Sequence, residues 1–183
     1  SGLTVGQTLT WTGSAETNGR FNITGGADAD TIIGGTGGDT ISGSGGSDSI
    51  TSGSGNDSIS GGAANDTLVF GVNLTSSDTI DGGSGTGDVL TFTDGNGASD
   101  DLDRVTNVET ITLGNADTNV TSVDTLVASG ATLTVDGSGL TVGQTLTWTG
   151  SAETNGRFNI TGGADADTII GGTGGDTISG SGG

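Results

Sequence analysis

The sequence lacks the residues on which most enzymes, disulfide-bonded proteins and nucleic-acid-binding proteins depend. Its 183 residues include no cysteine, no histidine, no proline and only three basic side chains. Without cysteine, disulfides cannot hold the fold together. Without histidine, a nucleophile elbow or a His-Glu metal motif, nothing supports catalysis, and we expect neither enzyme activity nor a small-molecule substrate. The 22 acidic residues give a net charge of -19, which excludes a nucleic-acid partner.

Apolar residues are also scarce. Leu, Ile, Val and Phe together account for 38 of the 183 residues, while glycine accounts for 40. No apolar run is long enough to cross a bilayer and no basic patch could anchor the chain, so we expect no membrane insertion. A core this thin cannot offset the ordering entropy of so many glycines. A bound divalent cation would neutralise the acidic residues and fix the glycine turns, so we expect folding to depend on one.

Five consecutive nine-residue blocks occupy residues 25–69: GGADADTII, GGTGGDTIS, GSGGSDSIT, SGSGNDSIS and GGAANDTLV. Each block has aspartate at position six, a small polar residue at position seven and an aliphatic residue at position eight. We expect the first six residues of a block to turn and present oxygens to a cation, and the last three to form a strand. The aliphatic residues should point inward, and these are Ile32, Ile41, Ile50, Ile59 and Leu68. A flexible Gly/Ser/Asp linker would have no reason to keep this spacing.

The blocks fit the pattern G-G-x-G-x-D-x-U-x, and by it the chain resembles the RTX family of calcium-binding nonapeptide repeats. The resemblance implies a parallel β-roll in which two blocks make one coil, with coils about 4.8 Å apart. Stacked aspartates at that distance would repel one another unless calcium lay between them, with backbone carbonyls completing its shell. We therefore expect several Ca²⁺ ions, and a chain that is mostly disordered without calcium.

The predicted calcium ligands form two columns. Asp30, Asp48 and Asp66 belong to one column, and Asp39 and Asp57 belong to the other. The register slips after residue 69, but Asp78 and Asp88 are still followed by a small or β-branched residue and an aliphatic one, so we assign them to the columns too. Asp167 and Asp176 match Asp30 and Asp39 in a second copy. A further acidic group, Asp100, Asp101 and Asp103, is either another calcium site or a solvated turn, and we favour the turn.

A longer repeat encloses the short one, because residues 1–46 recur without change as residues 138–183, at an offset of 137 residues. Even loop residues such as Gln7, Glu16 and Asn18 are kept, which exceeds what fold maintenance requires. Either the gene holds near-identical tandem copies, which we favour, or the duplication is engineered. Both ends of the chain cut across a repeat, so we expect a longer parent protein.

Residues 89–161 contain short runs that alternate apolar residues with Thr or Ser and predict strands: 89–92, 108–113, 132–135, 145–149 and 158–161. The chain is therefore all-β, and we predict a parallel β-solenoid with calcium-binding turns that continues into coils without calcium. A β-sandwich over the flanking region is the open alternative. The expected domains are the end of a flanking solenoid (1–24), the calcium roll (25–90), a flanking solenoid or sandwich (91–161) and the start of the next roll (162–183).

This organisation favours a calcium-dependent structural repeat unit of a secreted bacterial surface layer, filament or giant adhesin, exported by type I secretion as the resemblance implies. Its partners would be identical units stacked end to end or laterally. Extracellular calcium modules bind at about 10⁻⁴ to 10⁻³ M, which places the protein outside the cell or on the bacterial cell surface. Two alternatives stay open. One is an export and folding module of a secreted enzyme or toxin, and the other is an ice-binding solenoid suggested by the segment 36–39.

Overall fold

The protein is an all-β solenoid in the computed structural model, which describes residues 3–183. Seventeen strands occur and no helix is present among these residues, so none of the described chain could cross a membrane as an apolar helix. The first two residues of the predicted segment 1–24 lie outside the described residues. The strands are β1 (Thr10–Thr12), β2 (Asn22–Thr24), β3 (Thr31–Thr36), β4 (Thr40–Gly45), β5 (Ser49–Ser54), β6 (Ser58–Ala63), β7 (Thr67–Gly71), β8 (Thr79–Ser84), β9 (Val89–Phe92), β10 (Val105–Thr106), β11 (Thr110–Leu113), β12 (Thr118–Thr121), β13 (Thr132–Asp136), β14 (Leu146–Thr149), β15 (Arg157–Thr161), β16 (Thr168–Ile170) and β17 (Thr177–Ser179).

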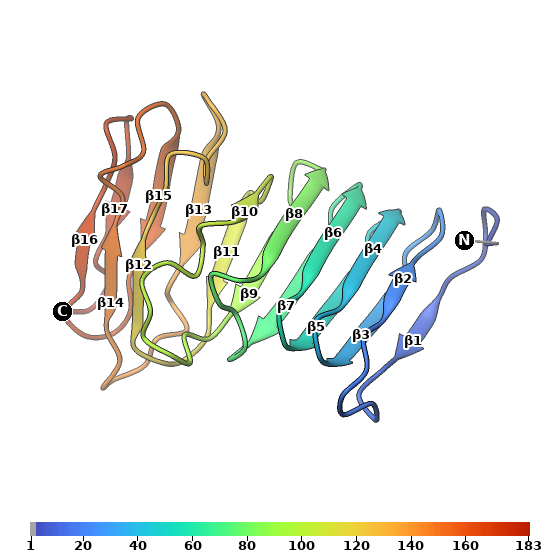
Figure 1. The fold of residues 1–183 in the computed structure, drawn as a ribbon. Helices are drawn as coiled ribbons and strands as arrows, with labels where there is room; N and C mark the ends of the chain where they lie inside the picture. Colours follow the sequence, from blue (N-terminus) through green and yellow to red (C-terminus); the bar gives the residue numbers. More distant parts are fainter. Residues whose placement is uncertain (1–2) are drawn as a thin grey trace.

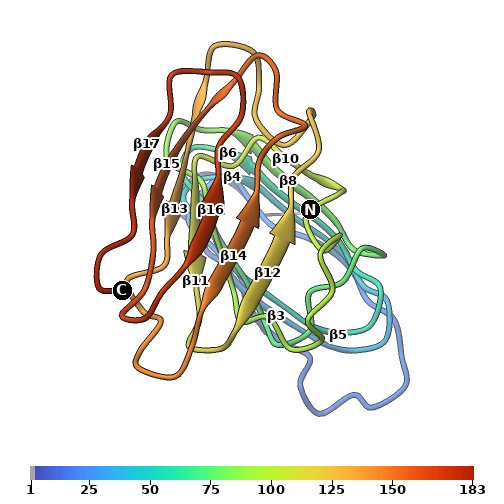
Figure 2. The same ribbon diagram turned by 90° about the vertical axis from the view of Figure 1, so that its left-hand side faces the viewer.

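Odd-numbered and even-numbered strands form the two walls of the solenoid (Figures 1 and 2). The odd strands make one nine-stranded sheet that runs in chain order from β1 to β17. The even strands make a five-stranded sheet, β10-β8-β6-β4-β2, and a three-stranded sheet, β12-β14-β16. Neighbouring strands in these sheets pair in parallel, for example β3 with β5 and β13 with β15. The predicted parallel β-solenoid is confirmed, and its strands continue through residues 91–161; the domain boundaries themselves stay a prediction.

The core is a narrow stack of aliphatic side chains between the walls. In the nine-stranded sheet, successive strands align one buried residue per coil, and the register joins Ile32, Ile50, Leu68, Leu90, Ile111, Val135 and Ile160. All of these are buried. The residues at position seven of the five blocks are exposed. The alternation of buried and exposed side chains is what a strand with one face on the core requires.

The strands of the nonapeptide region are longer than the sequence predicted. Strands β3 to β6 each span six residues, the last three of one block and the first three of the next. The prediction that six residues turn is therefore wrong for the second to fifth blocks, where the turn takes only three, whereas in the first block residues 25–30 all lie outside the strands. Glycine makes the extension possible: Gly53 has φ 100° and lies so close to the Gly35 carbonyl oxygen that a Cβ there would overlap it.

Corresponding strands of the two copies of the long repeat lie on opposite walls. Strands β14 to β17 repeat β1 to β4, so one unit contributes the thirteen strands β1 to β13. Because thirteen is odd, β1 belongs to the nine-stranded sheet while its counterpart β14 belongs to the three-stranded sheet on the other wall. Strand β2 and its counterpart β15 are exchanged in the same way. Figure 2 shows the second copy end-on, with β14 and β16 on one wall and β15 and β17 on the other.

Candidate metal centre

A column of buried aspartates runs along one edge of the roll. In each coil the aspartate carboxylate accepts a hydrogen bond from the backbone N–H of the aspartate one coil earlier. The donor and acceptor are 2.7 Å apart from Asp30 N to Asp48 Oδ1, 2.8 Å from Asp48 N to Asp66 Oδ1 and 2.7 Å from Asp66 N to Asp88 Oδ1. All four side chains are buried. The structure thus brings Asp88 into this column, as its local sequence predicted.

A second column lies at the other edge and holds Asp39, Asp57 and Asp78. Asp39 N donates to Asp57 Oδ1 at 2.7 Å, and Asp57 N donates to Asp78 Oδ1 at the same distance. Asp78 is also fixed from its own turn, because Thr75 donates to its Oδ2 through both the backbone N–H and the hydroxyl. Asp78 therefore occupies the position predicted for it despite the longer turn that precedes it.

The first column ends on a residue that the sequence analysis missed. Asp88 N donates to Glu109 Oε2 at 2.9 Å, so Glu109 takes the place of the next aspartate. Glu109 is followed by Thr110 and Ile111, the same acid–small–aliphatic order as in the blocks. That order, 21 residues after Asp88, is the signal that could have identified it.

In the second copy, Asp167 and Asp176 keep the hydrogen bond to the preceding coil, and no coil follows them among the described residues. Asp167 Oδ1 accepts from Leu146 N, and Asp176 Oδ1 accepts from Phe158 N, each at 2.8 Å. Both side chains are only half-buried, whereas their counterparts Asp30 and Asp39 are buried. A site that draws on two coils therefore has both coils in the first copy, and one coil among the described residues of the second.

Three carboxylate oxygens in the first column have no hydrogen-bond partner although they are buried: Asp48 Oδ2, Asp66 Oδ2 and Asp88 Oδ2. A buried anion without a partner is strongly disfavoured. Burial, reinforced by the neighbouring Asp66 and Asp30, raises the pKa of Asp48 to about 6. Burial, reinforced by Asp88, raises the pKa of Asp66 as well. In the second column burial, with Asp78 and Asp39 nearby, raises the pKa of Asp57 to about 6. These carboxylates need a positive charge in order to stay ionised.

The unpaired oxygens face a cradle that no side chain can enter. A Cβ on Gly43 would overlap both Asp48 Oδ2 and the Gly61 carbonyl oxygen of the next coil on that edge. A Cβ on Gly61 would in turn overlap Asp66 Oδ2 and the Gly82 carbonyl oxygen. Carboxylate and carbonyl oxygens from adjacent coils therefore converge at the glycines that open the third and fifth blocks. Calcium prefers such all-oxygen ligand sets, and the residues present fit it.

Backbone carbonyls would have to supply a large share of the ligands. Among residues 3–183 no group of three or more acidic, histidine or cysteine side chains is close enough to hold a metal ion. Each predicted site has two stacked carboxylates, which agrees with a cation held jointly by side chains and turn carbonyls. The assignment of each individual aspartate as a calcium ligand stays a prediction.

The acidic group at residues 100–103 forms a turn, with Asp103 N donating to the Asp100 carbonyl oxygen at 3.1 Å. The expectation that the whole turn is solvated is wrong, because Asp101 is buried while Asp100 and Asp103 are exposed. Burial, together with the neighbouring Asp94, Asp100 and Asp78, raises the pKa of Asp101 to about 6. Asn96 Nδ2 donates to its Oδ1 at 3.4 Å, a long contact.

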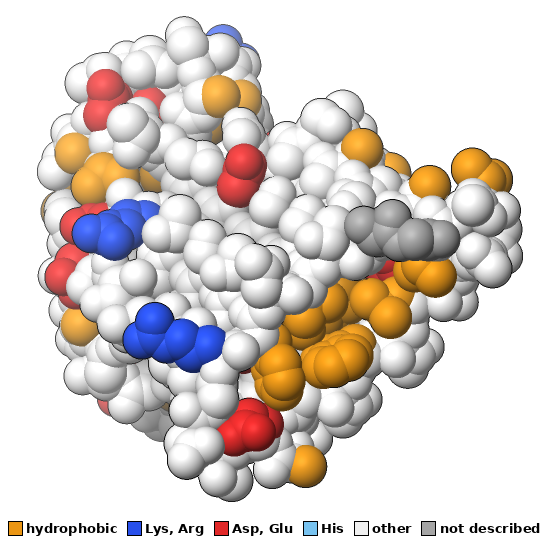
Figure 3. Space-filling view, turned by 45° about the vertical axis from the view of Figure 1, so that its right-hand side comes forward, with side chains coloured by type: hydrophobic (Ala, Val, Ile, Leu, Met, Phe, Trp, Pro, Cys, Tyr) orange, Lys and Arg blue, Asp and Glu red, His pale blue; other side chains and the backbone are white. Residues whose placement is uncertain are grey.

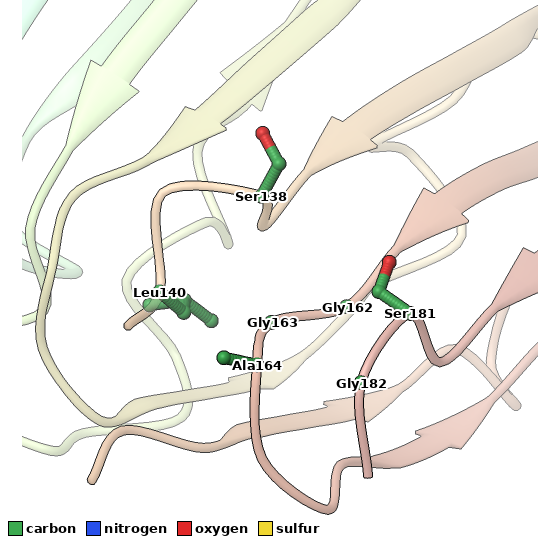
Figure 4. A pocket seen from close by; sticks show the side chains of 7 residues that line it. All are labelled: Ser138, Leu140, Gly162, Gly163, Ala164, Ser181 and Gly182. Carbon is green, nitrogen blue, oxygen red and sulfur yellow. The ribbon is translucent and has the colours of Figure 1, made fainter. Parts of the chain in front are cut away.

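Trp148 packs in the core. It is fully buried, and its ring meets that of Phe158 edge to face, with centroids 5.5 Å apart. A cavity of about 290 Å³ lies near the end of the second copy, and no charged side chain lines it (Figure 4). It is lined by Ser138, Leu140, Gly162, Gly163, Ala164, Ser181 and Gly182. Small residues without charge give it no chemistry of its own.

Comparison with known proteins identifies one family. A model of the RTX calcium-binding nonapeptide repeat matches residues 22–41, 42–72 and 159–183. The matched residues include Asp30 to Asp66 of both columns as well as Asp167 and Asp176, whereas Asp78, Asp88 and Glu109 lie outside them. No curated protein and no solved structure shows a significant match to the chain.

Proposed function

We propose that this chain, which carries RTX calcium-binding nonapeptide repeats at residues 22–72 and 159–183, is a structural repeat unit of a secreted bacterial surface layer, filament or giant adhesin. The carrying observation is that the solenoid passes from one copy of the 46-residue segment to the next without leaving the parallel sheet. In such a fold, stability comes from contacts between neighbouring coils, so length is added simply by adding copies.

Calcium would bind between successive turns at the aspartate columns. The proposed ligands are the side chains of Asp30, Asp39, Asp48, Asp57, Asp66, Asp78 and Asp88, with Asp167 and Asp176 in the second copy. The bound cation supplies positive charge to carboxylates that are otherwise buried and unpaired. The glycine cradle holds the ligand oxygens of two coils together, so occupancy of a site and pairing of its coils support each other.

The extracellular setting and the partner follow from the same proposal. RTX repeat proteins are typically secreted, and calcium outside the cell would complete folding there. Identical units, stacked end to end or laterally, are the proposed partners. The ice-binding alternative gains no support, because the Thr36 hydroxyl donates to the Glu16 carbonyl oxygen at 3.1 Å and so serves the fold. Its counterpart Thr173 donates to the Thr154 carbonyl oxygen at 3.0 Å.

Electron microscopy of the purified chain with calcium and with chelator tests the proposal. We expect ordered filaments or sheets in calcium and dispersed, disordered chains in chelator. The double variant Asp48→Asn, Asp66→Asn is the matched control, since it removes two carboxylates while keeping their size, and it should need more calcium to assemble. Compact monomers under both conditions would overturn the structural reading and favour an export or folding module.

A further inference from the structure

The outer face of the nine-stranded sheet carries two straight ranks of small side chains, and we call it the hydroxyl face. The register of neighbouring strands aligns one outward-facing residue per coil in each rank. The first rank runs from Thr10 to Thr177 and the second from Thr12 to Ser179. Thirteen of these eighteen positions hold threonine or serine. All eighteen side chains are exposed or half-buried, so the ranks form an open surface.

The hydroxyl face is almost uncharged although the chain has a net charge of -19. Asp136 is the one charged member of the two ranks. Other acidic side chains lie in the buried columns, in turns or, like Asp81 of β8, on the other wall. Figure 3 shows another part of the surface, where acidic and basic side chains are scattered among uncharged ones. Two copies of this acidic protein would therefore repel each other least through their hydroxyl faces.

The hydroxyls of this face are not used by the fold. Among residues 3–183 none of them donates a hydrogen bond, whereas hydroxyls at the turns do. Thr36 donates to the Glu16 carbonyl oxygen at 3.1 Å, and Thr154 donates to Asp124 Oδ1 at 2.8 Å. Threonine is stiff at χ1, so holding it in a contact costs little side-chain entropy. The face thus offers ordered donors and acceptors to a partner.

The other wall is a less regular surface. Its strands form two separate sheets, because β10 and β12 are not hydrogen-bonded to each other. Asp81 also lies within its outward-facing residues, between Ser60 and Thr106 in the strand register. A continuous and nearly uncharged face is therefore found on the side of the odd-numbered strands.

We infer that the hydroxyl face is a lateral docking surface for the hydroxyl face of a second copy of this chain. The inference rests on the proposed array function and names the surface through which neighbouring arrays pack. Two copies that meet about a two-fold axis present the same patch to each other. Two β-sheets pack face to face about 10 Å apart, with the side chains of one sheet between those of the other. The equal spacing of the ranks in both copies permits this packing.

The size of the face determines how strong the contact is. Nine strands about 4.8 Å apart span about 40 Å, and two ranks cover a strip about 10 Å wide, so each copy would bury roughly 400 Å². Stable interfaces bury about 800 Å² per partner. We therefore expect single chains to associate weakly, at roughly millimolar concentration, and linked units to associate more strongly because their contacts form together.

Static light scattering of the full chain in calcium, over protein concentrations up to about millimolar, tests the choice of face. The double variant Thr51→Glu, Thr91→Glu places two acids two coils apart in the second rank. It should raise the concentration needed for association about 10-fold, since like charges then face each other. The control Thr24→Glu, Ser60→Glu adds the same charge at the third residue of two strands on the other wall and should have little effect. Circular dichroism confirms that each variant is folded.

A charge swap tests whether the partner is the same face. The variant Thr51→Lys, Thr91→Lys, mixed with Thr51→Glu, Thr91→Glu, should associate at a concentration about 10-fold lower than the glutamate variant alone, because opposite charges then meet. The control Thr24→Lys, Ser60→Lys should give no such gain in the mixture. Equal effects of the test and control pairs would overturn the choice of face, and no gain on mixing would overturn the pairing of two hydroxyl faces.

Failure of this inference is distinguishable from failure of the proposed function. Calcium-dependent sheets that form equally well in the variant Thr51→Glu, Thr91→Glu would overturn the hydroxyl face as the docking surface and leave the function standing. An unaltered chain that stays monomeric in calcium at every concentration would overturn the function as well. If that monomer slowed the growth of ice and the glutamate variant did not, the hydroxyl face would belong to ice instead of a second copy.

Discussion

Residues 3–46 and 140–183 have the same sequence, but several of their counterpart side chains differ in exposure. Trp11 is 38% exposed and Trp148 is 0% exposed, whereas Ile41 is 1% exposed and Ile178 is 45% exposed. The first copy is covered by the coils that follow it, and the second by the coils that precede it. Sequence therefore sets which side chains of a coil point inward, and the neighbouring coils decide whether those side chains are buried.

The aspartates of the two copies also differ in burial, and the difference indicates what a calcium site requires. Asp39 is buried because the following coil supplies Asp57, whose Oδ1 accepts the Asp39 N–H. Asp176 is the same residue of the same block, and it is half-buried with no following coil among the described residues. One nonapeptide block therefore supplies half a site, and the cation couples the folding of two coils.

Removal of calcium should have the largest effect and should erase the difference between the two copies. Without a cation the buried carboxylates repel one another, so we expect the far-UV circular dichroism of the β-structure to be lost in excess chelator. The single-tryptophan chains Trp11→Phe and Trp148→Phe report on each end. Trp148 fluorescence should move to longer wavelength on chelation, while Trp11 fluorescence should change much less. Full β-structure in chelator would contradict this prediction.

Acidification should partly replace calcium. The pKa of Asp48 and that of Asp57 are about 6 in the fold, against about 3.9 for an unfolded aspartate. The folded chain thus binds protons more tightly than the unfolded one. This contribution to stability is complete below about pH 4 and is lost as the pH rises through about 6. We expect the calcium-free chain to gain β-structure when the pH is lowered from 7.5 to 4, measured by circular dichroism.

Protons and calcium compete for the same carboxylates of the folded chain, so the calcium affinity of the folded chain should fall as the pH falls through about 6. The double variant Asp48→Asn, Asp57→Asn is the control, because it cannot titrate at these positions and should show a smaller pH dependence. If the variant were as pH-sensitive as the unaltered chain, other titratable groups would have to cause the pH dependence.

Truncating one isoleucine in each copy tests whether its position in the roll alone decides how much it contributes to the free energy of unfolding. Ile41→Ala should lower the free energy of unfolding by about 2–5 kcal/mol, because it leaves a cavity in the core. Ile178→Ala removes the same atoms from a side chain that is 45% exposed, and should lower it by less than about 1 kcal/mol. Denaturant titrations in saturating calcium measure both values. Equal losses of unfolding free energy in the two variants would show that the ends of the roll are covered in solution.

A matched pair of charge-removing variants tests whether position in the roll also decides the contribution of the aspartates at the calcium sites. Asp39→Asn should destabilise the calcium-bound chain by about 1–3 kcal/mol, since a buried carboxylate that accepts backbone hydrogen bonds is lost. Asp176→Asn should cost less than about 0.5 kcal/mol, because its site lacks a second coil. Calcium titrations followed by circular dichroism should show a raised midpoint for Asp39→Asn alone. A similar shift for both would indicate that one coil is enough.

The sequence predicted the core of the nonapeptide blocks and both columns because their spacing is a direct consequence of parallel stacking. Asp78 and Asp88 were found despite longer turns, since the acid and the aliphatic residue two positions later survive the insertion. Glu109 was missed because the pattern was read for aspartate. The exchange of walls was missed for a different reason: it depends on an odd number of strands, and the short strands β10 and β12 carry too little alternation to be counted from sequence.

The smallest expected effect on stability concerns position four of the blocks, where the fifth block has alanine in place of glycine. Gly37, Gly46 and Gly55 occupy position four of three blocks with φ of 102°, 93° and 130°, and Ala64 holds the same turn position with φ 77°. Alanine is strained there, so Ala64→Gly should stabilise the chain by up to about 1 kcal/mol in saturating calcium. Ala63→Gly, one residue earlier in strand β6, is the control and should destabilise by about 0.5–1 kcal/mol. Denaturant titration measures the change in the free energy of unfolding for both variants. Changes of opposite sign would show that the turn geometry is kept in every block. A loss of stability in both variants would mean that the fifth turn adopts another conformation when calcium is bound.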